Sequence, residues 1–108
     1  ISDNAIMYAK DAGHPRTTYL QKSLFDLDHV GWSHRFDLIV MTGVLYPQYV
    51  GESLRLASMI IDDLLEPGGH LISAHILEWY KIRFPYTTLN REYYQYKEYT
   101  HILEVYEK

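Results

Sequence analysis

Two short stretches of the chain are almost continuously apolar, and a helical pattern lies between them. The stretches are residues 36–42 (FDLIVMT) and residues 70–76 (HLISAHI). Each stretch is too short for a buried helix and too apolar for a strand with one solvent-exposed face. A short, continuously apolar stretch is typical of a strand in a parallel sheet that is covered on both faces. Residues 50–65 carry apolar side chains at helical spacing, and the Pro-Gly-Gly run that follows ends this helix. Strand, helix and strand with tight turns predict a βαβ crossover with two parallel strands.

The rest of the pattern predicts smaller elements around this unit. We expect a helix over residues 3–12, a strand over residues 17–22, a loop over residues 28–34 and a terminal strand over residues 101–107. Residues 91–99 fit a helix and an edge strand equally well. Because the terminal strand is rich in tyrosine and charge, we place it at a sheet edge. The predicted fold class is α/β, a partial Rossmann-like three-layer sandwich with parallel central strands and an antiparallel C-terminal edge strand.

Composition narrows the function classes. The 108 residues suffice for one small domain, and the net charge of −4 comes from interspersed acids and bases, which argues against a nucleic-acid surface. The longest apolar run is far too short to span a membrane. The chain has no cysteine, which excludes disulfides and thiolate metal sites and fits a cytoplasmic protein. The six histidines are scattered without metal-ligand spacing, so we expect no metal site.

Four segments in sequence order carry a family likeness. They are ISDNAIMYAKDAG, TTYLQKSLFDL, FDLIVMTGVLYP and LLEPGGHLISAHI. Together they resemble the second half of class I S-adenosylmethionine-dependent methyltransferases, and within that family the small-molecule N-methyltransferases of the nodulation type. The chain has no G-x-G loop and starts without Met, in what reads as the middle of a fold. We therefore expect residues 1–108 to be an incomplete methyltransferase domain that lacks the first strand and the Gly-rich loop.

The resemblance implies methyl transfer from S-adenosylmethionine to a small-molecule acceptor, by a fragment or shortened relative that is inactive alone. It implies cofactor contacts from three groups of residues: Ser2 beside the ribose; Ser23, Leu24, Phe25 and Asp26 beside the adenine; and Met41, Thr42 and Gly43 at the rim where the fourth strand of the family ends. Either Asp26 or the Ser23-Leu24 pair takes the adenine-contacting place. Tyr46 would flank the transferred methyl group, and His75 would act as a base or orient the acceptor.

Each of these residues also has a plain structural interpretation. Gly43 can simply permit a tight turn, and Tyr46 can pack on a helix. His75 can be a buried, hydrogen-bonded histidine, Ser2 can cap the first helix, and Asp26 can be an exposed loop residue.

Three further alternatives stay open. The chain can be a catalytically silent, methyltransferase-like binding or assembly module, since a fold alone carries no activity. A different Rossmann-type enzyme, such as a dehydrogenase, is disfavoured by the missing dinucleotide fingerprint. The tyrosines near the C-terminus can stack on an aromatic acceptor or form a solvated edge or a dimer contact; they are Tyr93, Tyr94, Tyr96 and Tyr99. A sheet edge without its neighbouring strand also predicts a tendency to form homodimers.

Overall fold

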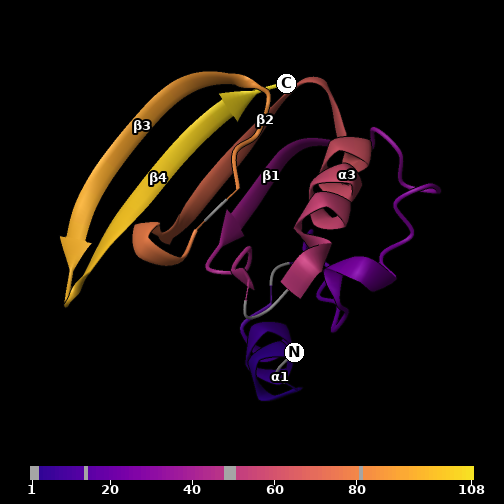
Figure 1. Cartoon of the computed structure of the whole chain (residues 1–108). Coiled ribbons are helices and arrows are strands. Elements are labelled where there is room, and N and C mark those ends of the chain that lie inside the picture. Colours follow the sequence, from indigo (N-terminus) through magenta and orange to yellow (C-terminus); the bar gives the residue numbers. More distant parts are fainter. Residues whose placement is uncertain (1–2, 14, 48–50, 81) are drawn as a thin grey trace.

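The computed structural model describes all residues except 1–2, 14, 48–50 and 81. Its helices and strands are α1 (Asp3–Asp11), β1 (Phe36–Thr42), α3 (Leu54–Leu64), β2 (Leu65–Ile76), β3 (Thr87–Tyr96) and β4 (Tyr99–Glu107) (Figure 1). The described residues also include three single turns of 3-10 helix: η1 (Leu24–Asp26), η2 (Gly51–Ser53) and η3 (Leu77–Trp79). No helix in the described part of the chain is long and apolar enough to cross a membrane.

The four strands form one mixed sheet in the order β1-β2-β4-β3. β1 and β2 are parallel neighbours, with pairs that run from Leu38 opposite His70 to Thr42 opposite Ala74. α3 connects them, so the predicted βαβ unit is confirmed. The remaining pairings, β2 with β4 and β4 with β3, are antiparallel.

The C-terminal strand is antiparallel, but its predicted edge position is wrong. β4 pairs with β2 on one side and with β3 on the other, and β3 forms the edge. The charged side chains suggested a strand at a solvent-exposed edge. From Ile102 onward every second residue of β4 is nevertheless buried, because Ile102, Glu104 and Tyr106 all point to the same face of the sheet. Residues 91–96 lie in β3, residues 97–98 form the following turn and Tyr99 begins β4, so of the two alternatives the edge strand is confirmed.

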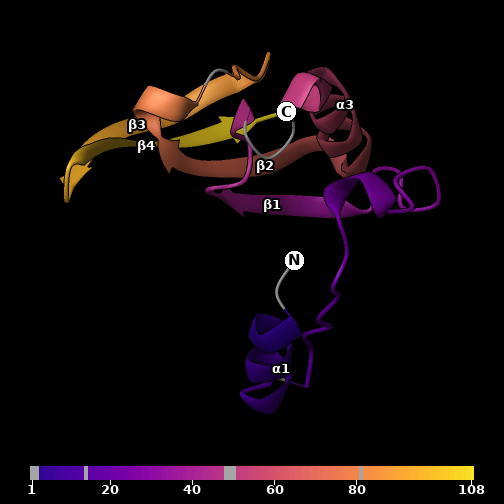
Figure 2. The same cartoon turned by 60° about the horizontal axis from the view of Figure 1, so that its bottom comes forward.

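The strand expected over residues 17–22 is also wrong. This segment has no regular structure, and all of its side chains except that of Tyr19 are exposed. Threonine and tyrosine favour strands only where a neighbouring strand supplies hydrogen bonds and packing. The segment runs between η1 and α1, away from the sheet (Figure 2).

Only one face of the sheet is covered by packed elements. α3 and the segment after β2 lie over it, and α1 stands apart on the opposite side (Figure 2). The covered face contains the core residues Leu45, Ala57, Ile61, Leu71, Ile102 and Tyr106, each at most 1% exposed. On the open face, Leu38 and Val40 of β1 are 50% and 56% exposed. The described residues therefore form a sheet with one packed layer, and the third layer of the predicted sandwich is not confirmed.

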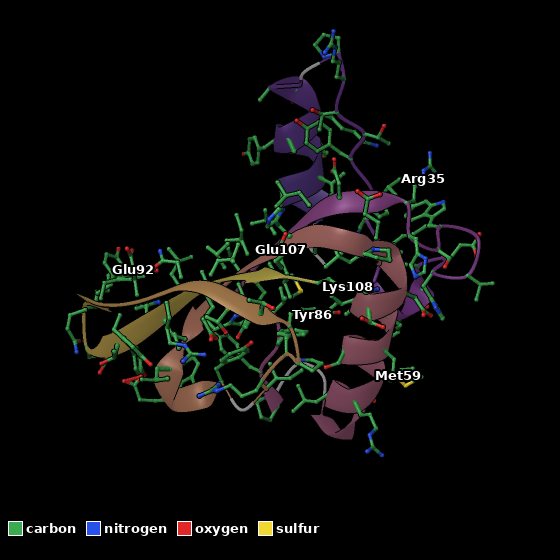
Figure 3. The ribbon with its side chains drawn as sticks, turned by 90° about the horizontal axis from the view of Figure 1, so that it is seen from above. Arg35, Met59, Tyr86, Glu92, Glu107 and Lys108 are labelled. Atoms are coloured by element: carbon green, nitrogen blue, oxygen red, sulfur yellow. The ribbon has the colours of Figure 1, made fainter. Side chains whose placement is uncertain are left out.

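The C-terminal end of α3 carries acidic residues, which the helix dipole disfavours. The structure supplies compensating partners for them. The Lys108 ammonium donates to the carbonyl oxygens of Asp62 (2.7 Å) and Leu65 (2.8 Å) and lies 3.3 Å from the Asp62 carboxylate (Figure 3). His29 Nδ1 lies 2.8 Å from the Asp63 carboxylate. We call the Lys108 contacts the C-terminal clasp, because they tie the residue that follows β4 to the junction of α3 and β2.

Candidate functional site

The carboxyl ends of β1 and β2 meet at one edge of the fold, where open α/β sheets bind ligands. Gly43 follows β1 with a φ of 65°, a left-handed conformation that side-chain-bearing residues rarely adopt. Its N–H donates to the Ala74 carbonyl oxygen at 2.9 Å. Gly43 therefore turns the chain away from the sheet while one further hydrogen bond holds the two strand ends together.

Tyr46 connects the loop after β1 to the end of β2. Its hydroxyl oxygen accepts a hydrogen bond from the Ile76 N–H at 2.6 Å, and its side chain is 4% exposed. The ring meets those of His75 and Trp79 edge to face, with centroid distances of 5.3 and 5.7 Å. These contacts fix the loop rigidly over the strand ends.

His75 is fully buried and hydrogen-bonded through both ring nitrogens. Nε2 accepts the N–H of Leu45 at 3.2 Å, which leaves the proton on Nδ1. Nδ1 then donates to Ser73 Oγ at 2.9 Å, and the ring stacks on Tyr80 at 4.4 Å. Burial lowers the pKa of His75 from 6.5 to about 4, although the charge of Glu104 opposes the shift. His75 is therefore neutral at pH 7.

The polar groups beneath the rim form a buried cluster that the sequence did not reveal. Ser73 Oγ donates to the Tyr80 hydroxyl at 3.4 Å, and burial raises the pKa of Tyr80 to about 12. Glu104 pairs with Ser73 across β2 and β4 and has no exposed surface. Its Oε2 accepts from Arg91 Nε and Nη2, both at 2.9 Å. The sequence did contain one signal for the burial of Glu104. Side chains alternate between the two faces of a strand, so Glu104 lies on the same face as the apolar core residues two positions before and after it in β4.

A hollow of about 440 Å³ opens at the rim, and we call it the rim hollow. It is lined by Thr42, Gly43, Tyr46, Ala74, His75, Ile76, Trp79, Tyr94 and His101. Its volume falls in the usual range for small-molecule sites. The structure thus brings together four of the residues singled out in the sequence, namely the rim pair at 42–43 and the two candidate catalytic residues.

The other candidate residues lie elsewhere. Met41 is buried in the core and, together with Leu24, lines a second, apolar hollow of about 260 Å³ between β1, α3 and η1. Ser23 caps η1, since its Oγ accepts the N–H of Phe25 at 3.3 Å. Phe25 and Asp26 are exposed. These residues share no lining position with the rim hollow, and Ser2 lies outside the described residues.

The residues that the structure describes contain no group of three or more His, Asp or Glu side chains that could hold a metal ion. No protein-family model matches the chain, and neither does any curated protein. A functional assignment therefore depends on the geometry of the site and on the resemblance of the four segments.

Proposed function

We propose that this chain is part of a methyltransferase that uses S-adenosylmethionine and acts on a small-molecule acceptor. The observation that supports it best is the arrangement of β1 and β2: parallel neighbours joined by α3, with their carboxyl ends at the rim hollow. The family resemblance implies this arrangement for its fourth and fifth strands. The proposal puts the cofactor at the rim pair Thr42-Gly43, which lies at the carboxyl end of β1 and lines the rim hollow.

The rim residues suit one end of the cofactor. Bound S-adenosylmethionine would supply an electrophilic methyl group, and the rings of Tyr46 and Trp79 line the hollow where this end of the cofactor would lie. Among the described residues, none that lines the rim hollow is Asp, Glu, Lys or Arg. The residues expected to contact adenine do not line this hollow, so the fit is limited to the methyl-bearing end.

In this proposal the protein acts by positioning. The rim pair Thr42-Gly43 and Tyr46 would hold the methyl-bearing end of the cofactor against the acceptor. In-line alignment of the reactants supplies most of the rate effect. His75 serves as a positioning residue rather than a base, because Leu45 N–H already occupies its unprotonated nitrogen. Tyr46, held by Ile76 N–H, flanks the acceptor side.

The test is an amide NMR titration with S-adenosylhomocysteine. We expect weak binding, with shifts at Gly43, Leu45 and Ala74. Gly43→Ala should abolish these shifts, whereas Gly68→Ala should preserve them. The control is matched because Gly68 also has a positive φ, of 83°, and lies near the first residues of β2, at the end of the strand opposite the rim. Absence of rim shifts in the folded wild-type chain at saturating ligand would contradict the proposal.

A second candidate is a silent binding or assembly module. The exposed apolar side chains Leu38 and Val40 on the open face of β1 favour it, because exposed apolar surface often marks a protein contact. A folded chain that binds no S-adenosylhomocysteine but associates through this face would select this candidate.

A further inference from the structure

Aromatic rings from four different segments line the rim hollow: Tyr46 follows β1, Trp79 belongs to η3, Tyr94 to β3 and His101 to β4. Tyr94 and His101 are cross-strand partners whose rings stack, with centroids 5.0 Å apart and planes 12° apart. Trp79 is held between Tyr46, at 5.7 Å, and Tyr99, at 4.9 Å. Because each ring is fixed by another ring, the hollow has a preformed aromatic wall.

The described side chains that line this hollow include no Asp, Glu, Lys or Arg, so none of them carries a fixed charge that could neutralise an ionised ligand. Its titratable side chains are His75 and His101, and buried His75 is neutral at pH 7. The nearby carboxylate of Glu78 is used elsewhere, since its Oε1 accepts the N–H of Thr100 at 3.0 Å. Moving an unpaired charge into such a site from water is costly. The polar groups that remain at the rim, including the Thr42 hydroxyl, can hydrogen-bond an uncharged ligand.

We propose that the rim hollow binds an uncharged, planar aromatic compound, with its ring against the Tyr94–His101 stack and Trp79. This inference rests on the proposed function only in identifying that compound as the methyl acceptor. Aromatic pairs contribute beyond their buried area, so the wall selects a flat ring over a saturated one of equal size.

Three probes of similar size separate the ligand classes. p-Cresol is aromatic and uncharged at pH 7, 4-methylcyclohexanol is its saturated counterpart, and tetramethylammonium is a cation that aromatic cages bind. We expect p-cresol to shift the amides of Ala74, Ile76 and Tyr94 with affinity in the millimolar range. 4-Methylcyclohexanol should bind about three- to tenfold more weakly.

A matched pair of variants locates the contact. Tyr94→Leu should weaken p-cresol binding by about three- to tenfold, whereas Tyr93→Leu should leave it unchanged. Tyr93 is the adjacent residue, is 58% exposed, pairs with Ile102 on the other face and does not line the rim hollow. Both positions are exposed, so we expect both variants to fold.

Two results would overturn the inference: equal affinity for p-cresol and 4-methylcyclohexanol, or tighter binding of tetramethylammonium than of p-cresol. The S-adenosylhomocysteine titration separates its failure from that of the proposed function. Rim shifts with S-adenosylhomocysteine but none with p-cresol overturn the aromatic ligand alone. Selective p-cresol binding without any response to S-adenosylhomocysteine overturns the methyltransferase and supports the aromatic site.

Discussion

The two faces of the sheet are made from the same strands, yet their environments are opposite. On the covered face Met41, Leu71 and Ile102 are at most 8% exposed, whereas on the open face Leu38 and Val40 are half-exposed. One step along β1 separates the two environments. An unbroken apolar run therefore shows that both faces can be covered, and the neighbouring elements decide whether they are.

The largest difference in stability between the two faces should appear when one leucine on each face is replaced by alanine. Leu71→Ala should lower the free energy of unfolding by about 3 kcal/mol, because it leaves a cavity in the core. Leu38→Ala on the neighbouring strand should cost less than about 1 kcal/mol, since its side chain is 50% exposed. Urea denaturation measures both values. Equal losses would remove the distinction between the faces.

Local pattern determined part of this fold, and tertiary partners determined the rest. β1 was expected over residues 36–42 and is found there, and the long helix was expected over residues 50–65 and is found at Leu54–Leu64. Both follow from short-range periodicity. Residues 17–22 have comparable strand propensity but pair with nothing, so their propensity alone could not make a strand.

The candidate site shows the same division. The rim pair at 42–43 follows from where β1 ends, and the sequence identified it. The surroundings of His75 could not be found that way, because Leu45 lies 30 positions away in the chain. Glu104 was interpreted as an edge residue and is instead buried in the middle of the sheet, since β4 lies between β2 and β3.

The next largest effect should be a pH dependence of stability that comes from His75, which is buried on the covered face. Its pKa is about 4 in the folded protein against an ordinary 6.5, so the unfolded chain takes up the proton first as the pH falls. The corresponding stability is complete above about pH 6.5 and is lost towards pH 4, by an amount on the order of 2–3 kcal/mol. Unfolding free energies measured between pH 7 and 4 should show this loss.

The matched variants for this titration are His75→Gln and His70→Gln. The first should flatten the pH dependence. The second is the control for removing a histidine, because the side chain of His70 is 45% exposed and lies outside the buried cluster. An unchanged slope in His75→Gln would show that other groups cause the loss.

A smaller effect is expected at the buried carboxylate. Arg91→Met should cost about 2 kcal/mol, because it leaves the Glu104 charge buried without its partner. Glu92→Gln, on the next residue and facing away (Figure 3), should change stability by less than about 0.5 kcal/mol. In a double-mutant cycle, adding Glu104→Leu to Arg91→Met should recover part of the loss. Strict additivity would contradict a coupled pair.

The smallest effect on stability, and the clearest on association, should come from the open face itself. Val40→Thr should change the free energy of unfolding by no more than about 0.5 kcal/mol. It should reduce concentration-dependent self-association in light scattering, because Val40 is an exposed apolar residue on an edge strand. Met59→Thr on the outer side of α3 (Figure 3) is the control and should not change association.

The C-terminal clasp has a consequence for the order in which the described elements can assemble during synthesis. Lys108 holds the Asp62 carbonyl 46 positions earlier, and its backbone pairs with Gly68 and Gly69. β4, which separates β2 from β3, is also translated after both of them. While the ribosome still holds this segment, β3 has no partner and α3 has no clasp, so the sheet assembles in a late step that joins distant parts of the chain.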